Sequence, residues 1–491
     1  MKVWRRVCAA TAGLLVFSWG GSVNAEPRGQ KMEAAVDEVF EDLTASGSPG
    51  CALGVYRNGQ MIYAKGYGLA NVEERVPITP KSVFDIGSTS KQFTAASILL
   101  LEKQGKLSVN DDVRKYLPEL PDYGNKITIL NLLNHTSGLR DYLTLMELAG
   151  IPTDSVTTDE DALALIARQR ALNFAPGSEW LYSNTGFFLL STIVKRVSGK
   201  PLREFAGENI FTPLGMTQTQ FRDSHTSLIA NRALAYDANE KRGGYTLNVS
   251  YFEQTGDGAV HTSVEDLLKW DENFYTGQIG GKIFLAELQE HGKLNNGKVL
   301  DYAKGLNVAE YRGLHTVRHG GSWGGYRAEL LRFPDQHFSV ACLCNVGNAN
   351  PERRANEVAD VYLASLMKAK DLKKELDAVR KKEISGPPLT AEQLRAYVGD
   401  YGSEELGVTY RLGIQDGNLK LAAVLDRAGL PRANNFLPND LRHAGTDEFA
   451  IGGRSATLKF KRDGLGAPSE FVLDAGRTTG LTFTRLATTA R

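Results

Sequence analysis

A junction between an extended stretch and a helix near residue 90 constrains the fold of this chain more than any other feature. Residues 83–87 are typical of a short strand, residues 93–101 form an apolar helical run, and Ser-Thr-Ser-Lys lies between them at 88–91. Residues three apart on a helix lie one above the other, so the Lys91 amine can reach the Ser88 hydroxyl. Free backbone N–H groups in a first helical turn also favour an oxyanion. The junction therefore predicts a nucleophile beside a base.

The same spacing of serine and lysine recurs at Ser365 and Lys368. We expect this second copy to lie inside a long, charged amphipathic helix from Pro351 to about Lys382, where surface decoration explains both side chains. Only Ser88 is then placed for chemistry.

The composition is that of a soluble globular protein, with 42% hydrophobic and 23% charged residues in a chain of 491. That length exceeds one ordinary domain, so we expect at least two. The 57 basic and 57 acidic residues give a formal net charge of zero, which provides no electrostatic reason to bind nucleic acid.

Residues 1–25 have the pattern of a secretory signal peptide. Basic residues at 2, 5 and 6 precede an apolar stretch from Val7 to Trp19, and Val-Asn-Ala at 23–25 suits cleavage. No later stretch is long and apolar enough to span a membrane. The sequence therefore predicts an exported protein, periplasmic or extracellular, without stable membrane insertion once the signal is removed.

The cysteines give no sign of a disulfide-rich scaffold. Cys8 would leave with the signal, and Cys51, Cys342 and Cys344 each lie in an apolar, strand-like segment. We expect them to be small buried hydrophobic residues rather than disulfide partners, although their redox state stays open. The histidines have no metal-binding spacing, so neither a metal nor a cofactor is expected.

The pattern up to about residue 384 predicts an α+β domain. Residues 31–43 have helical periodicity, and residues 50–65 alternate around Asn58-Gly59, the strongest short signal for a two-residue hairpin. Helices dominate the middle of the chain. Three further strand-like runs follow at 315–319, 326–333 and 338–345. We expect one antiparallel sheet built from both ends of this region, flanked by helices, with an inserted helical subdomain.

A second, smaller domain is expected at the C-terminus. Ser-Gly-Pro-Pro at 385–388 cannot continue a helix and indicates a linker between a domain at 26–384 and one at 389–491. Beyond it, short alternating segments separated by Gly, Asp and Asn predict a small all-β barrel or sandwich. These segments are 409–414, 419–424, 456–461, 470–473 and 481–485.

A second candidate motif is Tyr182-Ser183-Asn184, which precedes the helical run 185–197. Tyr182 would exchange a proton with the nucleophile or the leaving group, and Asn184 would hold a substrate amide or carbonyl. Tyr123-Gly124-Asn125 has the same pattern but lies in a loop rich in Pro, Asp and Gly, where turn chemistry explains it.

A third candidate motif is His-Gly-Gly-Ser at 319–322, at the end of a predicted strand. The missing side chains of Gly320 and Gly321 let a ligand approach the backbone, and the Ser322 N–H can face the Ser88 N–H to form an oxyanion hole. A plain glycine-rich hairpin turn would explain the same residues.

Taken together and in this order, the three motifs resemble those of the serine β-lactamase and penicillin-binding protein superfamily, in particular its class C β-lactamase-like branch of esterases, D-aminopeptidases and DD-peptidases. The resemblance covers roughly residues 30–370. Supporting stretches are 84–88 (Phe-Asp-Ile-Gly-Ser), 132–139 (Leu-Leu-Asn-His-Thr-Ser-Gly-Leu), 213–216 (Pro-Leu-Gly-Met) and 256–258 (Gly-Asp-Gly). The resemblance implies that the first motif supplies the nucleophile and lysine, the second the tyrosine and asparagine, and the third the strand that edges the substrate.

The third motif departs from the β-lactamase pattern, which typically reads Lys-Thr-Gly and holds the drug's carboxylate with a permanent cation. Here His319 stands in its place, and at an ordinary pKa of about 6.5 it would be only partly charged at neutral pH. This disfavours efficient β-lactam hydrolysis. The His-Gly-Gly variant looks more like family esterases and D-aminopeptidases, some of which also carry C-terminal barrels, so the resemblance implies a lipocalin-like barrel at 389–491.

Three further residues near these motifs can be explained by the fold rather than by catalysis. His135, in its family-like segment, resembles a structural histidine hydrogen-bonded in a turn. Trp323 and Tyr326 line the cleft or pack in the core, and the sequence leaves both open.

The sequence thus predicts a hydrolase that attacks an ester or amide carbonyl through an acyl-enzyme on Ser88. Lys91, kept partly neutral by burial, or Tyr182, ionised by nearby positive charge, would take the Ser88 proton. The N–H groups of Ser88 and Ser322 would stabilise the oxyanion, Asn184 would orient the substrate, and Tyr182 would protonate the leaving group.

Two rival functions stay open at this stage. One is a D-amino-acid peptidase, DD-carboxypeptidase or β-lactamase acting on cell-wall peptides or β-lactams. The other is a catalytically silent penicillin-binding or sensing protein, which retention of both catalytic motifs disfavours. In each case the partner is a small-molecule or peptide substrate, and the oligomeric state is not predicted.

Overall fold

The computed structural model describes residues 28–43, 47–369, 386–424, 439–451 and 456–487. The predicted signal peptide, residues 1–25, lies outside the described residues. No helix in the described part of the chain is both long and apolar enough to cross a bilayer.

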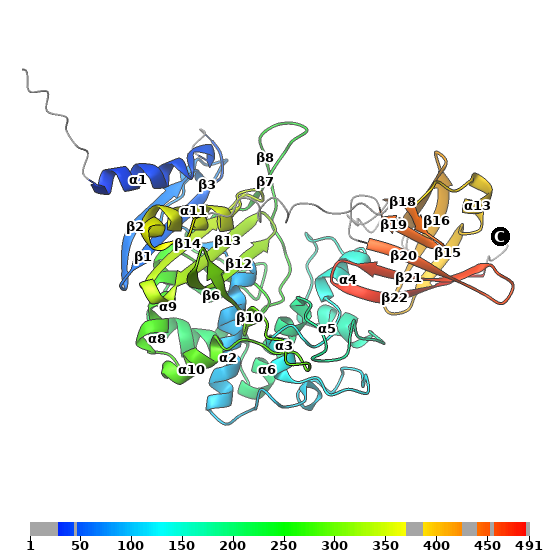
Figure 1. The fold of residues 1–491 in the computed structure, drawn as a ribbon, viewed down its shortest axis with the longest axis horizontal. Coiled ribbons are helices and arrows are strands. Elements are labelled where there is room, and N and C mark those ends of the chain that lie inside the picture. Colours follow the sequence, from blue (N-terminus) through cyan, green and yellow to red (C-terminus); the bar gives the residue numbers. More distant parts are fainter. Residues whose placement is uncertain (1–27, 44–46, 370–385, 425–438, 452–455, 488–491) are drawn as a thin grey trace, which may run out of the picture.

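The main sheet has seven antiparallel strands, and its order places an N-terminal hairpin beside C-terminal strands (Figure 1). From one edge to the other they are β10 (Tyr302–Ala303), β11 (Leu306–Tyr311), β12 (Leu314–Trp323), β13 (Tyr326–Phe333), β14 (Phe338–Cys344), β1 (Cys51–Arg57) and β2 (Gln60–Tyr67). The prediction of one sheet assembled from both ends of this region is confirmed. So is the hairpin, because Asn58 and Gly59 turn between β1 and β2 with φ values of 53° and 73°.

Both faces of the sheet are covered by helices. Alternate residues of a strand point to opposite faces. Accordingly, Leu53 and Val55 of β1 pack in the cluster that contains α1 (Arg28–Glu38) and α11 (Pro351–Leu363). Ala52 and Tyr56 pack in the larger cluster on the other face, with α9 (Val264–Thr276).

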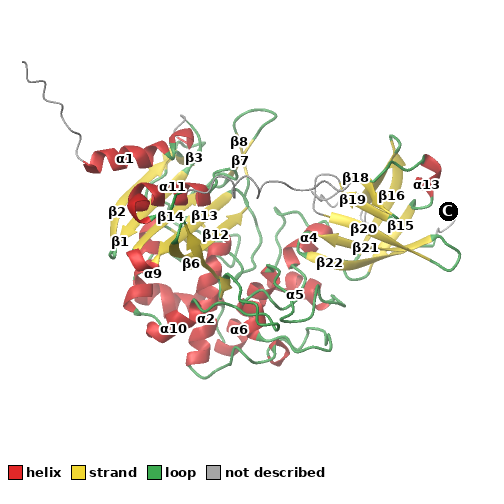
Figure 2. Ribbon diagram, in the orientation of Figure 1, coloured by secondary structure: helices red, strands yellow, loops and turns green. Residues whose placement is uncertain are grey.

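A helical region lies between β5 (Phe84–Asp85) and the later strands, as predicted. It consists of the 3-10 turn η2 (Gly87–Ser90), α2 (Lys91–Lys103), α3 (Ile129–Leu133), α4 (Tyr142–Leu148), α5 (Asp159–Ala167), α6 (Asn184–Ser198), α7 (Leu202–Ala206) and α8 (Thr212–Leu214). A small sheet of β5, β9 (Val260–Thr262) and β6 (Gln220–Phe221) and the helix α10 (Gly281–Leu288) complete this part. Figure 2 shows these helices gathered on one side of the sheet.

The predicted helix from Pro351 to about Lys382 is too long. Helix α11 ends at Leu363, a 3-10 turn continues only to Leu366, and Met367 is extended. The physical reason is a tertiary contact: the Lys368 N–H donates to the Arg312 carbonyl at 2.8 Å, and the Arg312 guanidinium donates to the Lys368 carbonyl. Residues 370–385 lie outside the described part.

The expectation that the cysteines are unpaired is wrong for Cys51 and Cys344, although Cys342 is a free, buried cysteine as expected. Cys51 of β1 lies directly opposite Cys344 of β14, and the two form a disulfide across 293 residues of sequence. Such a separation leaves no local signal in the sequence. The Cys342 sulfur lies within 4.8 Å of the other two, but with those sulfurs bonded to each other it is a lone buried thiol rather than part of a metal site.

The C-terminal strands form a closed barrel, which settles the choice between barrel and sandwich. The strands are β15 (Gly399–Ser403), β16 (Val408–Gln415), β17 (Asn418–Ala423), β18 (Asn439–Gly445), β19 (Glu448–Ile451), β20 (Ala456–Arg462), β21 (Pro468–Ala475) and β22 (Thr478–Arg485). Five of them were predicted, while β15, β18 and β19 were not. A short helix, α13 (Ala391–Arg395), precedes the barrel, and the exact domain boundaries stay a prediction.

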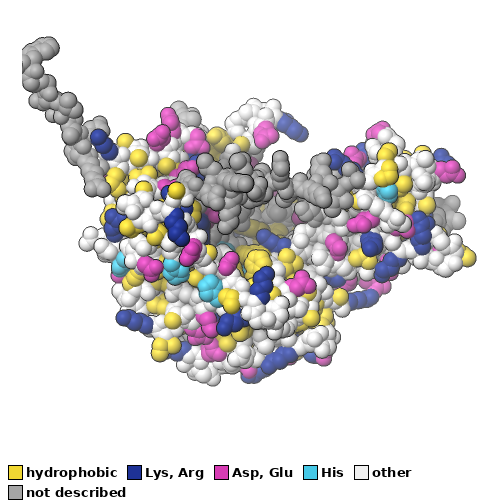
Figure 3. Space-filling model, viewed as in Figure 1, with side chains coloured by type: hydrophobic (Ala, Val, Ile, Leu, Met, Phe, Trp, Pro, Cys, Tyr) yellow, Lys and Arg dark blue, Asp and Glu magenta, His cyan; other side chains and the backbone are white. Residues whose placement is uncertain are grey.

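The barrel lies beside α4 and α5 of the larger part (Figure 1). The Tyr410 hydroxyl in β16 donates to the Leu148 carbonyl at the end of α4 at 2.5 Å. Charged side chains of both signs are interspersed over the face drawn in Figure 3, in keeping with a formal net charge of zero.

Candidate active site

Ser88 and Lys91 meet at the start of α2. Ser88 lies in η2, is half-buried and lines a cavity of about 660 Å³. Lys91 is fully buried, and its Nζ donates to Ser88 Oγ at 3.1 Å and to Asn184 Oδ1 at 2.9 Å. A third bond goes to the Asp257 carbonyl at 2.5 Å. A neutral amine satisfies the same three contacts, because its two N–H groups can donate to the Asn184 and Asp257 oxygens while its lone pair accepts from the Ser88 hydroxyl.

Burial changes the charge state of this lysine. Loss of solvation lowers the pKa of Lys91 to about 7, while the nearby Asp257 carboxylate acts in the opposite direction. Burial raises the pKa of Asp257 in turn, and the Tyr142 hydroxyl donates to its Oδ2 at 3.1 Å. A substantial fraction of Lys91 is thus neutral at physiological pH and can accept a proton.

Tyr182 lies beside this pair with a buried hydroxyl. Its ring centroid is 4.9 Å from Lys91 Nζ. The neighbouring Ser88 side chain lowers the pKa of Tyr182, but burial outweighs it and raises that pKa above its usual range. The hydroxyl makes no hydrogen bond of full geometry to any described residue. A buried hydroxyl without a partner inside a cavity is free to bind a group on a ligand.

Asn184 begins α6 and is fixed from behind. Its backbone N–H donates to Asp141 Oδ2 at 2.6 Å, while the other carboxylate oxygen of Asp141 caps α4 by accepting from the Thr144 N–H. With its side-chain oxygen on Lys91, Asn184 links the starts of α2, α4 and α6.

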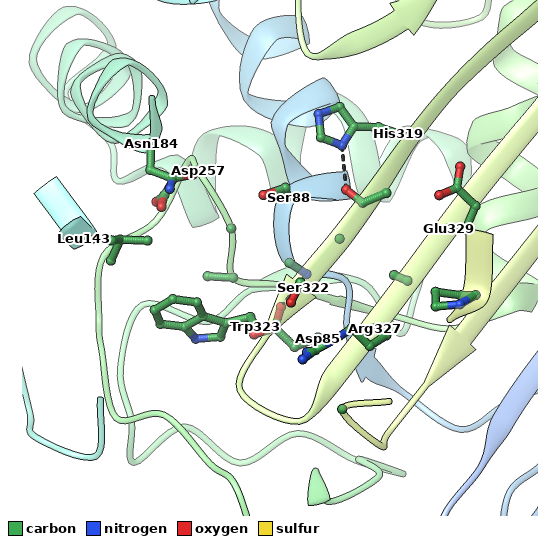
Figure 4. A pocket seen from close by; sticks show the side chains of 18 of the residues that line it. Asp85, Ser88, Leu143, Asn184, Asp257, His319, Ser322, Trp323, Arg327 and Glu329 are labelled. Atoms are coloured by element: carbon green, nitrogen blue, oxygen red, sulfur yellow. Dashed lines mark hydrogen bonds between the residues drawn. The ribbon is translucent and has the colours of Figure 1, made fainter. Parts of the chain in front are cut away.

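Strand β12 forms the opposite wall, with His319, Gly320, Gly321 and Ser322 lining the cavity. Figure 4 shows Ser88 between Asn184 and His319. A Cβ on Gly321 would lie 1.8 Å from the Ile86 carbonyl oxygen, and one on Gly87 would lie 2.6 Å from the Ser322 nitrogen. The glycines thus let β12 approach the backbone before Ser88, which explains them better than a plain hairpin turn does.

The prediction that His319 is partly charged at neutral pH is wrong. His319 is buried: its Nε2 lies 3.2 Å from the Tyr302 hydroxyl, and its Nδ1 lies 2.6 Å from the Gly320 carbonyl oxygen (Figure 4). Burial, with the Lys91 charge nearby, lowers the pKa of His319 to about 3. The ring is neutral, so Nδ1 donates to the carbonyl and Nε2 accepts from the tyrosine.

His135 and Tyr326 have structural roles near the site, whereas Trp323 lines the cavity. His135 is buried, and its Nδ1 accepts from the Ser183 N–H at 3.2 Å, so it supports the second motif. Trp323 lines the cavity against Phe252, whereas Tyr326 is buried and donates to the Ala233 carbonyl. Tyr123 is held outside this cavity by its bond to the Gln169 carbonyl.

The second serine–lysine copy has no such surroundings. Ser365 and Lys368 are both exposed, and neither lines the cavity around Ser88. The bare spacing is therefore not sufficient for a site, as the sequence context already indicated.

Sequence reasoning missed several residues of the site. Asp257 was not predicted as a site residue. Its position between two glycines, at 256–258, is the signal that could have indicated a loop near the ligand. Asp141, Tyr142 and Tyr302 have no recognisable local signal. Arg477 also lines the cavity, and it comes from the barrel, nearly 300 residues after Tyr182 in the sequence.

Comparison with known proteins places this geometry in a family. Residues 36–364 match the family described as Beta-lactamase. A penicillin-binding protein of Bacillus subtilis (strain 168) is 32% identical over 301 residues, which cover 58% of this chain and 66% of that protein. A D-aminopeptidase of Gluconobacter oxydans (strain 621H) is 28% identical over 394 residues, which cover 80% of this chain and 69% of that protein. The first curated relatives are thus matched over 56–69% of their length.

Solved structures share the fold. An octameric penicillin-binding protein homologue from Pyrococcus abyssi has 23% sequence identity and a TM-score of 0.61, with 94% of this chain and 100% of that chain covered. The D-amino acid amidase from Ochrobactrum anthropi SV3 has 22% identity and a TM-score of 0.58, with 68% of this chain and 99% of that chain covered. At these identities the likeness concerns the fold alone. The first match is long enough to extend into the barrel.

Proposed function

The chain belongs to the beta-lactamase family, and from that premise we propose that it is a serine hydrolase that cleaves ester or amide bonds through an acyl-enzyme on Ser88. The observation that carries this proposal is the buried Lys91 Nζ, 3.1 Å from Ser88 Oγ and with a pKa lowered to about 7. A serine hydroxyl beside a neutral amine is an activated nucleophile.

Acylation would begin with transfer of the Ser88 proton to Lys91. The Oγ then bonds to the substrate carbonyl carbon, and the carbonyl electron pair moves to its oxygen. We assign the base to Lys91 rather than Tyr182, because burial lowers the pKa of the lysine and raises that of the tyrosine. Tyr182, protonated and without a partner, is suited to give its proton to the leaving amine or alcohol and to regain one from Lys91.

The oxyanion would be bound by the N–H groups of Ser88 and Ser322. Support comes from the close approach of β12 to the residues around Ser88, where Thr89 Oγ1 also donates to the His319 carbonyl at 3.1 Å. Asn184 would orient the substrate from the opposite side. Water then attacks the acyl-enzyme by the same route in reverse, and Ser88 leaves with its proton restored.

The substrate proposal rests on His319 and on the relatives. A neutral, buried imidazole cannot hold a carboxylate as a lysine does, which disfavours β-lactams and favours esters or amides of the kind the class C-like esterase and D-aminopeptidase branch accepts. The relatives named D-aminopeptidase make peptides and amides of D-amino acids the first substrates to test. A DD-carboxypeptidase or β-lactamase is the alternative.

Export to the periplasm or the extracellular space is proposed as well. The signal-like residues 1–25 motivate it, and the Cys51–Cys344 disulfide supports it, because such bonds persist in oxidising compartments. Fractionation of cells that express the full chain tests this, and a cytoplasmic, uncleaved product would contradict it.

The central test compares Ser88→Ala with Ser365→Ala. A fluorophosphonate probe and a panel of chromogenic esters, D-aminoacyl anilides and a cephalosporin report labelling and turnover. We expect Ser88→Ala to abolish both and Ser365→Ala to retain both, because only Ser88 lies beside a buried lysine. Wild-type activity in the Ser88→Ala protein would refute the mechanism, and labelling without any turnover would favour the silent binding protein.

A further inference from the structure

The barrel places one exposed side chain, that of Arg477, at the edge of the active-site cavity. Gly476 and Arg477 form the turn between β21 and β22, and Arg477 lines the cavity that holds Ser88, Tyr182 and Asn184. Its guanidinium carbon lies 4.5 Å from the centroid of the Tyr182 ring. The same arginine lines the adjoining cavity of about 690 Å³ beside α4. Arg477 thus lies over the ring of the tyrosine that would protonate the leaving group.

Hydrogen bonds to its backbone hold the turn in place, and they do not involve the Arg477 side chain. The Arg477 carbonyl accepts from Asn173 Nδ2 at 3.0 Å, and the Thr479 N–H donates to Asn173 Oδ1 at 2.8 Å. Arg140 donates to the carbonyls of Thr479 and Gly480 at 2.9 and 2.8 Å. These bonds anchor the backbone at Arg477 and at the residues that follow it, and so fix the position from which the guanidinium extends.

The guanidinium has no anionic partner. Among the described residues, Arg477 makes no ion pair and no side-chain hydrogen bond, although it stacks on Tyr182. Two other arginines line the cavity and are fixed by bonds to backbone carbonyls, Arg222 to that of His225 and Arg327 to that of Gly324, although these bonds do not neutralise their charges. A cation presented to a cavity without a counter-charge is suited to bind an anion.

The usual cation of the third motif is missing at the same time. His319 stands in that position, and it is neutral and engaged with Tyr302. Lys91 is engaged with Ser88 and Asn184. Among the described cations that line the cavity, Arg477 is the one that stacks on Tyr182 and makes no hydrogen bond through its side chain, so it is placed to meet a negative charge on the Tyr182 side.

We propose that Arg477 of the barrel binds a carboxylate on the leaving-group side of the substrate and so selects substrates that release an anionic amine. The inference rests on the proposed function, because Tyr182 marks the leaving-group side. A guanidinium can donate two parallel N–H···O bonds to a carboxylate, and stacking on the Tyr182 ring fixes the orientation of the guanidinium plane. The catalytic part thus cleaves the bond, while the barrel binds the leaving group and so selects the substrate.

A matched pair of chromogenic substrates tests this. D-alanyl-4-nitroanilide has an uncharged leaving group, and D-alanyl-3-carboxy-4-nitroanilide differs by one carboxylate on it. In the full chain we expect Arg477→Gln to lower the ratio of kcat/KM for the carboxylated over the uncharged substrate by about tenfold to a hundredfold, the range of a lost charge-assisted pair. Arg477→Lys should restore part of the ratio. Arg411→Gln, which removes an exposed barrel arginine paired with Asp400, should leave the ratio as in the wild type.

A binding arm separates this inference from the proposed function. In a Ser88→Ala background, equilibrium titration should show the carboxylated anilide binding more tightly than the uncharged one, and Arg477→Gln should remove that difference. Equal binding of the two anilides with Arg477 present would overturn the inference, whatever the turnover. Preferential binding without turnover in the wild type would support the inference and overturn the proposed hydrolase.

Discussion

Removal of one carboxylate, at Glu405, should loosen the barrel from the catalytic part. Glu405 lies in the turn between β15 and β16, and its Oε1 accepts from Arg140 Nη1 at 2.6 Å. The side chains are 1% exposed for Arg140 and 9% exposed for Glu405. The adjacent Glu404 is the natural control, because it pairs with Arg170 while 79% of its side chain is exposed. Glu405→Ala breaks a buried pair and also removes the acceptor of the Arg170 N–H, whereas Glu404→Gln breaks an exposed pair.

Glu405→Ala should increase the undocked population about 20-fold to 100-fold more than Glu404→Gln does. Breaking a buried ion pair costs about 3–5 kcal/mol, because the remaining charge is left uncompensated. Arg140 keeps bonds to Gln169, Thr479 and Gly480, which places the expected cost near the lower limit, about 3 kcal/mol. At 1.4 kcal/mol for each factor of ten, the undocked population rises on the order of 100-fold. An exposed pair contributes about 0–1 kcal/mol, which is at most about fivefold.

Hydrogen exchange at the Thr479 amide measures this population. That N–H donates across the interface to Asn173 Oδ1, so it exchanges when the barrel undocks. Mass spectrometry of peptides that contain Thr479 should show exchange faster by on the order of 100-fold in Glu405→Ala and by less than about fivefold in Glu404→Gln. Equal acceleration in both variants would refute the claim that the buried pair fixes the barrel.

Two further predictions concern the catalytic part. For an uncharged ester, kcat/KM should rise with pH through about 7 and then level off, because only neutral Lys91 accepts a proton. Since the Asp257 charge raises the pKa of Lys91, Asp257→Asn should move that rise to lower pH, and a shift upward or no shift in the pH profile would contradict it. Gly321→Ala should slow fluorophosphonate labelling by about 100-fold or more, because its Cβ would lie 1.8 Å from the Ile86 carbonyl oxygen and displace β12. Gly413→Ala, where an added Cβ meets nothing within 4 Å, is the control, and similar labelling rates in the two proteins would refute the steric argument.

What the sequence predicted well is local. The Asn58-Gly59 turn needs two residues with positive φ, and Asn-Gly is the pair that adopts them most readily. The spacing of Ser88 and Lys91 predicts their contact because both lie on adjoining helical turns. Five of the seven strands of the sheet were predicted from their short apolar runs and the turn between β1 and β2, whereas β10 and β11 were not.

What the sequence could not predict depends on contacts between distant segments. The Cys51–Cys344 disulfide follows from the pairing of β1 with β14, and neither cysteine carries a local trace of it. The end of the helix at Leu363 depends on bonds between Lys368 and Arg312. The charge of His319 depends on burial against Tyr302, so an ordinary histidine pKa misled the prediction.

The dipeptide at 140–141 makes barrel docking and catalysis depend on each other. Arg140 holds the barrel turn through its side chain, while its carbonyl accepts from Thr185 Oγ1 at 2.7 Å. The next residue, Asp141, accepts from the Asn184 N–H and so positions the amide that contacts Lys91. Undocking therefore releases the Arg140 side chain, and the next residue in the chain, Asp141, is the one that positions Asn184.

This coupling gives the Glu405→Ala variant a second readout. If the barrel only selected substrates, the variant would lose discrimination between the two anilides and keep its kcat for the uncharged one. Because Arg140 and Asp141 are covalently joined, we expect kcat for the uncharged anilide to fall as well, in proportion to the undocked fraction that Thr479 exchange reports. A full kcat in a protein whose barrel is measurably undocked would show that Asn184 is held without help from the barrel, and that the barrel acts on specificity alone.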